Sequence, residues 1–265
     1  MKIDQSFFGT TSRGEQVDAY TLDNEQGISV KIITYGARLV SCITPDRKGK
    51  LGEITRSSNS LSDFETVMPY HGATIGRYTN RIAKASVRID GIDYTLSSDH
   101  PHCQLHGGPG GLHQVVWVAS PLVQEDRVSV VCTHSSPDGD QGFPGRLDIA
   151  LTMTLTSSGE LSFLYHAETT HPTYVSLTNH AFWNLAGSGS VFSHTLKMPA
   201  RTVVEVDEHL VPTGLLIPTA GTKYDFTSPK PIGRDADADG SPSGYDICYA
   251  VQEKRSGSPV LAAAA

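Results

Sequence analysis

Apolar and polar residues alternate along several stretches of the chain, which is the pattern of a strand with one buried face. In residues 147–155 every odd position carries a large apolar side chain, while the even positions carry Asp, Ala, Thr and Thr. A turn around Gly159 separates this stretch from residues 161–165, so the two stretches are predicted to form a hairpin. A second hairpin is predicted over residues 87–94, because the central Asp90-Gly91 pair readily takes the positive φ angles of a type I′ turn.

Evidence for helices is poor. Only residues 61–68 carry a short helical pattern, with Ser60 or Ser62 as its cap. Further β-rich stretches are residues 28–34, 115–119, 127–133 and 173–178. Because strands do not alternate with helices, a parallel α/β sheet is disfavoured. We find no internal repeat and no shift in composition that marks a linker. The sequence therefore predicts one all-β domain over residues 1–265, an antiparallel β-sandwich.

Composition and charge narrow the functional classes. Of the 265 residues, 38% are hydrophobic and 18% are charged, which disfavours a disordered chain and a membrane protein. The net charge is −7 and the basic residues form no cluster, so no nucleic-acid partner is predicted. A neutral small molecule fits this balance better. The N-terminal residues do not read as a signal peptide, and a cytoplasmic location is expected.

The four cysteines are scattered and contain no CxxC pair. In a chain of this size they are predicted to be buried, reduced thiols rather than a disulfide framework. They are Cys42, Cys103, Cys132 and Cys248.

Three segments resemble binding motifs but are incomplete. His100 and His102 would share one face of a strand as in some zinc sites, yet no further ligands complete a tetrahedral set, so a single functional histidine in this segment is preferred. Residues 235–246 begin like a calcium loop, but Pro242 interrupts it and an acidic surface turn is preferred. The glycines of residues 107–111 lack the following helix of a phosphate loop and are predicted to form a turn.

The segment of residues 177–185 is the strongest candidate for a binding site. It places His180 among Asn179, Phe182, Trp183 and Asn184. Aromatic faces together with amide and imidazole edges suit a sugar, because its C–H patches stack while its hydroxyls form hydrogen bonds. A buried structural histidine is the alternative for one isolated imidazole. The additional histidines of the 100–106 segment favour a site.

Four motifs together resemble the aldose 1-epimerase family, whose members include the galactose mutarotases. They are NRIA (residues 80–83), LHGG (105–108), LTNH (177–180) and GYD (244–246), in the family's order and spacing. The similarity extends from Phe8 to Tyr249. It implies a β-supersandwich fold and the interconversion of α and β anomers of hexoses such as glucose and galactose.

The same resemblance implies the roles of individual residues. His180 matches the general acid that protonates the ring oxygen, and His106 matches the second histidine near the reacting centre. Asn80, Arg81 and Asp246 match residues that hold the sugar hydroxyls. The side chains of His106, His180, Arg81 and Asp246 are expected to converge on one cleft. Mutarotation opens a hemiacetal and closes it on the other face, so neither cofactor nor metal is expected, and histidine suits the proton transfers.

The sequence departs from the family pattern at two points. Ile247 stands where the family has a histidine, and the family's general base is a glutamate in a motif that would lie beyond Ala265. Glu205, Glu208 and Glu253 do not match that motif. We therefore expect this chain to lack the closing strands and the base, and to be poorly soluble and nearly inactive.

Three functions compete at this stage. The first is an aldose 1-epimerase, represented by a truncated chain. The second is an inactive sugar-binding or regulatory relative. The third, a glycoside hydrolase, would need two facing carboxylates, and no such pair is evident. The sequence does not predict an oligomeric state.

Overall fold

The structure, a computed structural model, describes residues 1–237, 244–251 and 262–264, and most of its regular elements are strands in antiparallel sheets. This confirms the predicted all-β antiparallel class. The chain divides into two compact units, Met1–Trp183 and Asn184–Ala265, and each is described by itself. The organisation as a single domain stays a prediction.

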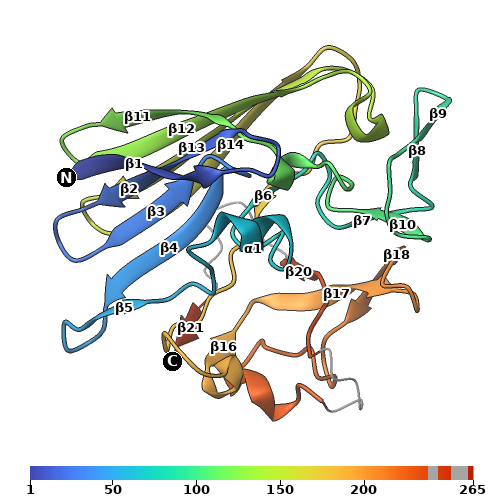
Figure 1. Cartoon of the computed structure of the whole chain (residues 1–265). Helices are drawn as coiled ribbons and strands as arrows, with labels where there is room; N and C mark the ends of the chain where they lie inside the picture. Colours follow the sequence, from blue (N-terminus) through green and yellow to red (C-terminus); the bar gives the residue numbers. More distant parts are fainter. Residues whose placement is uncertain (238–243, 252–261, 265) are drawn as a thin grey trace. The chain divides into compact units, whose positions relative to one another are not determined.

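The first unit contains two large antiparallel sheets, drawn in blue and in green to yellow in Figure 1. One sheet joins five strands in chain order: β1 (Lys2–Thr10), β2 (Gln16–Asp23), β3 (Ser29–Ile33), β4 (Arg38–Pro45) and β5 (Leu51–Glu53). The other joins four: β11 (Val118–Val123), β12 (Arg127–Ser136), β13 (Leu147–Thr156) and β14 (Leu161–Thr169).

The two sheets share one hydrophobic core, which makes this unit a β-sandwich. Leu22 and Val30 of the first sheet belong to the same buried cluster as Val130 and Leu151 of the second. Strand β13 alternates buried and half-buried positions along its whole length, as the pattern of residues 147–155 predicts. Each fully buried Leu or Val contributes about 1.5–3 kcal/mol, so this alternation fixes the face that turns inward.

Short elements surround the sandwich. They are α1 (Leu61–Glu65), β6 (Thr74–Ile75), β7 (Arg81–Ala83), β8 (Ser86–Ile89), β9 (Ile92–Thr95), β10 (Cys103–Leu105), β15 (Thr178–Asn179) and the 3₁₀ turns Leu112–Gln114 and Asp140–Gly142. The predicted hairpin is confirmed as β8 and β9, with φ of 50° at Asp90 and 82° at Gly91.

Three predicted elements are shorter in the structure than the sequence indicated. The helix ends at Glu65, where β-branched Thr66 and Val67 follow. In residues 115–119 the strand begins only at Val118, because a 3₁₀ turn precedes it and Trp117 donates its N–H to Thr34 instead. Of residues 173–178, only Thr178 lies in a strand.

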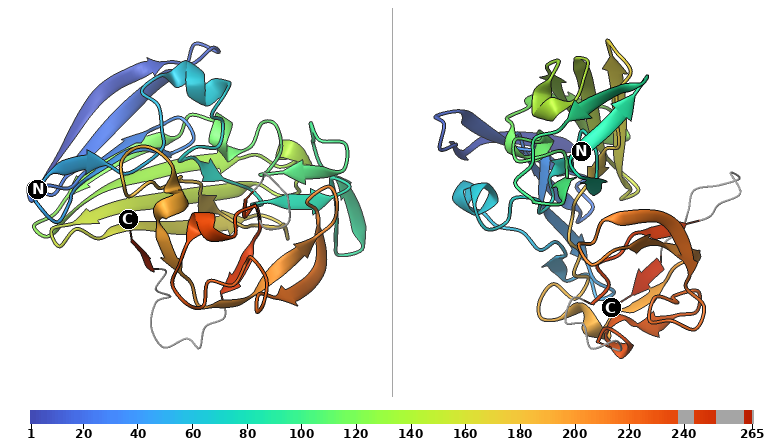
Figure 2. Two further views of the ribbon diagram at one scale, coloured as in Figure 1. Left: turned by 90° about the horizontal axis from the view of Figure 1, so that it is seen from below. Right: turned by 90° about the vertical axis from the view of Figure 1, so that its right-hand side faces the viewer.

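The second unit is built from shorter strands, drawn from orange to red in Figure 2. They are β16 (Thr195–Lys197), β17 (Ala200–Val206), β18 (Pro212–Pro218), β19 (Lys230–Pro231), β20 (Tyr249–Val251) and β21 (Ala262–Ala264), with the 3₁₀ turns Val191–Ser193 and Ile232–Arg234. Strand β17 lies between β18 and β20, and β16 lies between β19 and β21. A small core of Met198, Ala200 and Phe226 holds this unit together.

Buried Arg38, at the start of β4, organises the loop that leads into β6. Its side chain is fully buried and donates to the carbonyl oxygens of Met68, Pro69, His71 and His113, at 3.2, 2.9, 2.6 and 3.2 Å. Burial lowers its pKa to about 9. These bonds connect β4 to two loops distant in sequence.

Arg77, which follows β6 in the chain, likewise donates hydrogen bonds to carbonyl oxygens of a distant loop. It is 2% exposed and donates to the carbonyl oxygens of Ser136, Pro137, Pro144 and Gly145. The loop between β12 and β13 is thereby held to the segment after β6. Both arginines satisfy carbonyl groups that would otherwise be buried without a partner.

Replacing Arg38 by Met should destabilise the protein strongly. The apolar side chain removes the donors that Arg38 supplies to the carbonyl oxygens of Pro69, His71 and His113, and one such unpaired group costs about 1–3 kcal/mol. We expect Arg38→Met to lower the free energy of unfolding by at least about 3 kcal/mol, measured by urea denaturation.

Arg88→Met is the matched control, because the Arg88 side chain is 69% exposed. It should change the free energy of unfolding by less than about 0.5 kcal/mol. Equal effects of the two substitutions would contradict the role given to Arg38.

Candidate functional site

His106 and His180 lie together in the first unit although they come from distant loops. His106 follows β10 and His180 follows β15. Their ring centroids are 5.2 Å apart and their planes are nearly perpendicular, at 86°. Two imidazoles at this separation can serve neighbouring atoms of one small molecule.

The backbone around His106 fixes both the position and the tautomer of its ring. The residue has φ of 53°, and its N–H donates to the Asn80 carbonyl oxygen at 3.0 Å. In return the Asn80 N–H donates to Nδ1 of His106 at 3.1 Å. Because Nδ1 accepts this bond, a neutral imidazole carries its proton on Nε2. His106 is thereby set up as a hydrogen-bond donor through Nε2.

The glycine after His106 is required by a close backbone approach. Gly107 has φ of 86°, and a Cβ at this position would lie 1.8 Å from the Gly76 carbonyl oxygen. Any side chain would push the loop away from residue 76. The LHGG motif therefore needs glycine at position 107 for steric reasons, and His106 directly precedes this glycine.

The electrostatic environment keeps His106 neutral. Burial, together with the nearby bases His180, Arg81 and His100, lowers its pKa to about 4. Neighbouring His113 is 1% exposed, and burial together with Arg38 lowers its pKa to about 3. At neutral pH these two rings are uncharged.

His180 is fixed by the segment that Arg38 organises. Its N–H donates to Ala73 at 2.9 Å, and its carbonyl accepts from the N–H of Gly72 at 2.8 Å. The Asn179 side chain also donates to the Gly72 carbonyl, at 2.7 Å. Asn179 thus supports the backbone, whereas the sequence suggested its amide as a possible sugar contact.

Tyr70 joins the two histidines, and the sequence did not single it out. Its ring centroid lies 4.8 Å from His106, 4.8 Å from His113 and 6.1 Å from His180. The loop that carries it is held by Arg38. A lone tyrosine between two short elements follows no periodic pattern, so no local signal in the sequence could have identified it.

Phe182 extends the aromatic surface on the other side of His180. Its ring stacks on His71 at 4.3 Å and on His180 at 4.9 Å, and it is 40% exposed. A half-exposed aromatic face next to imidazole groups suits the C–H face of a sugar ring. This residue belongs to the segment that the sequence indicated.

Arg81 and Asn80 lie on the same side of the site as His106. Arg81 opens β7, which pairs with β10 in the register Arg81 to Leu105. Its Nη1 lies 3.5 Å from Oδ1 of Asn80. Four of the five predicted residues, namely His106, His180, Asn80 and Arg81, are thus neighbours in the first unit.

Asp246, the fifth predicted residue, belongs to the second unit and is exposed there. It is the central residue of a tight turn in which the Ile247 N–H donates to the Tyr245 carbonyl oxygen at 2.7 Å. This placement leaves its carboxylate accessible. Its convergence with the histidines stays a prediction.

The other candidate motifs are now placed. His100 and His102 are exposed in a loop before β10, so the prediction of a shared strand face is wrong, because the bend at residues 99–102 precedes the strand. In the described ranges, no group of His, Cys, Asp and Glu side chains is arranged to hold a metal ion. Asp235, in the calcium-like segment, binds Lys230 and Arg234, and residues 238–243 of that segment lie outside the described residues.

Three of the four cysteines are buried as predicted. Burial raises the pKa of Cys42 to about 11 and that of Cys132 to about 12, so both thiols stay protonated; Cys103 is also buried. Cys248 is exposed, which corrects the prediction, because it lies in the connection before β20 rather than on a core face. None of the helices among the described residues has the length and apolar character to cross a bilayer.

Comparison with known proteins relates the chain to one family. The family model described as aldose 1-epimerase matches residues 18–263. Galactose mutarotase of Rattus norvegicus is 36% identical over 240 residues, which cover 88% of this chain and 68% of that protein. Aldose 1-epimerase of Escherichia coli (strain K12) is 36% identical over 253 residues, which cover 94% of this chain and 72% of the enzyme.

A solved structure agrees with these similarities. The crystal structure of galactose 1-epimerase from Lactobacillus acidophilus superimposes with a TM-score of 0.87 at 25% sequence identity. The match covers all of this chain and 77% of that one. The β-supersandwich fold implied by the sequence resemblance is thereby confirmed at the level of the family.

The imidazole of His106 should stay neutral, with its proton on Nε2, down to about pH 5. The unfolded chain takes this proton near pH 6.5 and the folded chain near pH 4, so the free energy of unfolding should fall as the pH drops between these values. Long-range ¹H–¹⁵N NMR measures the titration midpoint and the tautomer of His106, and the His106→Asn variant identifies its resonance. A midpoint above about pH 6, or a proton on Nδ1, would contradict this assignment.

Proposed function

The chain belongs to the aldose 1-epimerase family of isomerases, and we propose that it interconverts the α and β anomers of hexoses such as glucose and galactose at the His106–His180 pair. The observation that carries this proposal is the edge-to-face approach of the two rings, with centroids 5.2 Å apart. Ring opening requires proton transfer at two neighbouring oxygens of the sugar, the ring oxygen and the anomeric hydroxyl. At this separation one imidazole can protonate the ring oxygen while the other holds the neighbouring oxygen at C1 by a hydrogen bond.

The two histidines take different roles. His180 acts as the general acid that protonates the ring oxygen as the C1–O5 bond breaks, while the proton of the anomeric hydroxyl passes to water. The resulting aldehyde can rotate about C1–C2, and the reverse proton transfers close the ring. His106 is neutral and donates through Nε2, because Asn80 occupies Nδ1. It therefore holds an oxygen near C1 and does not serve as the base in this state. This division of work follows from the hydrogen bond at Nδ1.

Polar and aromatic neighbours hold the sugar in place. Arg81 and Asn80, beside His106, bind hydroxyl groups, and Asp246 contributes a carboxylate to another hydroxyl. Phe182 offers its exposed face to the C–H groups of the ring. Neither redox chemistry nor a strong Lewis acid is needed, because mutarotation moves only protons.

An inactive sugar-binding protein is the second candidate, and one observation favours it. The charged groups that shift the pKa of His106 in the described part of the chain are His180, Arg81 and His100, all of them bases. A carboxylate that would accept the anomeric proton is not among them. With water as the acceptor, the rate is about 10²–10⁴ lower than with a positioned base, while the sugar still binds.

Substituting His180 should separate catalysis from binding. Because proton transfer occurs only on the reaction path, His180→Ala should lower kcat by about 10²–10⁴ and change KM by less than about tenfold. Polarimetry of freshly dissolved α-glucose and α-galactose measures both constants. His166→Ala is the control on β14, where the side chain is 71% exposed, and it should leave both constants unchanged.

The same assay decides between the two functions. Binding of hexose without acceleration of mutarotation by the unaltered chain would support the inactive sugar-binding protein. A His180→Ala variant as fast as the unaltered chain would show that another group protonates the ring oxygen.

A further inference from the structure

We propose that Tyr245 is a positioning residue for sugar binding: its hydroxyl anchors the turn that presents the Asp246 carboxylate. This inference rests on the proposed role of Asp246 as a ligand of the sugar hydroxyls. Tyr245 acts only through Asp246 and does not contact the reacting atoms. The evidence lies entirely within the second unit.

The Asp246 turn is short and is fixed on its downstream side by the sheet. The hydrogen bond from Ile247 to Tyr245 spans one residue, which is the pattern of a γ-turn with Asp246 at its centre. Two residues later the Cys248 carbonyl accepts from Val204 at 2.9 Å, and Tyr249 enters β20 beside β17. On the upstream side, the described residues show a side-chain hydrogen bond from Tyr245.

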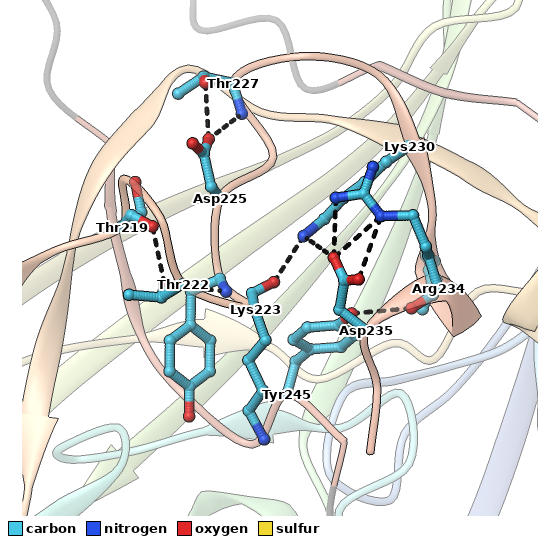
Figure 3. A network of polar contacts seen from close by, with 11 residues as sticks. Thr219, Thr222, Lys223, Asp225, Thr227, Lys230, Arg234, Asp235 and Tyr245 are labelled. Carbon is cyan, nitrogen blue, oxygen red and sulfur yellow. Dashed lines mark hydrogen bonds and ion pairs between the residues drawn. The ribbon is translucent and has the colours of Figure 1, made fainter. Parts of the chain in front are cut away.

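Tyr245 supplies that anchor through both its hydroxyl and its ring. The hydroxyl donates to the Ile232 carbonyl oxygen at 2.9 Å, a bond drawn in Figure 3. The ring meets Phe226 edge to face, with centroids 5.1 Å apart, and Phe226 is 1% exposed. Tyr245 is thus held at both ends, and its carbonyl is the acceptor that closes the Asp246 turn.

The segment that receives the hydroxyl is itself held by an ion pair between a buried lysine and a partly exposed aspartate. Lys230 is 3% exposed and donates to the Lys223 carbonyl at 2.6 Å and to Asp235 at 2.8 Å. Arg234 also binds Asp235, and these two cations lower the pKa of Asp235 to about 2 (Figure 3). Ile232 lies between Lys230 and Asp235 in sequence, so the ion pair of these two residues restrains the backbone that carries the Ile232 carbonyl.

The geometry points to a rigid path from the buried Lys230 to the exposed Asp246. Rigid presentation matters because a flexible carboxylate must be ordered each time a sugar binds. Losing one hydrogen bond of this kind should weaken hexose binding about three- to tenfold, through greater freedom of the turn. Proton transfer at the histidines should be affected much less, so KM rises more than kcat falls.

Tyr245→Phe tests this with a matched control in the same aromatic cluster. It removes only the hydroxyl and keeps the ring contact with Phe226. Tyr249→Phe removes a buried hydroxyl for which the described structure shows no hydrogen-bond partner, and the Tyr249 ring lies 6.3 Å from Phe226. Galactose affinity, measured by calorimetric titration, should fall for Tyr245→Phe and stay constant for Tyr249→Phe.

A double-mutant cycle separates positioning from a general loss of structure. Asp246→Asn should weaken galactose binding by itself, and Tyr245→Phe should add nothing further in that background, because it acts through Asp246. Additive losses would overturn the proposal. So would an unchanged affinity of Tyr245→Phe beside a weakened Asp246→Asn, and this result would leave the proposed function intact.

Amide hydrogen exchange gives a readout that does not depend on the sugar. In the Tyr245→Phe variant the amide of Ile247 should exchange faster, while amides of β13 in the first unit keep their rates. If Asp246→Asn binds galactose as well as the unaltered chain, the role of Asp246 in the proposed function is wrong and the inference fails with it. Unchanged exchange at Ile247 overturns the anchoring alone.

Discussion

The candidate site depends on one buried charge, the Arg38 guanidinium, whose two terminal nitrogens donate hydrogen bonds to backbone carbonyl oxygens. The Arg38 guanidinium is fully enclosed, and its donors reach the carbonyl oxygens of two loops distant in sequence. The loop after α1 carries Tyr70 against both proposed catalytic rings, and its continuation at Gly72 and Ala73 forms backbone bonds with His180. A sandwich of sheets supplies the platform, but this arginine gives irregular segments one conformation.

The chemistry of the site follows from that rigidity. Each nitrogen of a neutral imidazole is either a donor or an acceptor. The Asn80 N–H makes Nδ1 of His106 the acceptor, so Nε2 is the donor. The left-handed backbone of residue 106 and the close approach of Gly107 to residue 76 hold the ring where this bond can form. Burial then keeps the ring neutral near physiological pH. Backbone geometry, rather than a neighbouring charge, sets the tautomer.

The sequence predicted the sheets better than the loops, for a physical reason. Alternation in residues 147–155 reflects burial against the facing sheet, and an Asp-Gly turn reflects local backbone preference, so both leave a local signal. Motif resemblance led to His106 and His180, which the structure brings side by side. Tyr70 and Arg38 left no such signal, because their importance comes from contacts across the fold. The exposed bend at His100 shows that histidine spacing alone does not define a strand.

The most direct test of the central claim, that His106 and His180 form one hexose-binding centre, is a titration of ¹⁵N-histidine-labelled protein with galactose. The Nε2 resonances of His106 and His180 should shift together and give one dissociation constant. The resonance of His166, exposed on β14, should stay in place. If neither ring of the pair responds, or if the two respond with different dissociation constants, the two histidines do not form a common site.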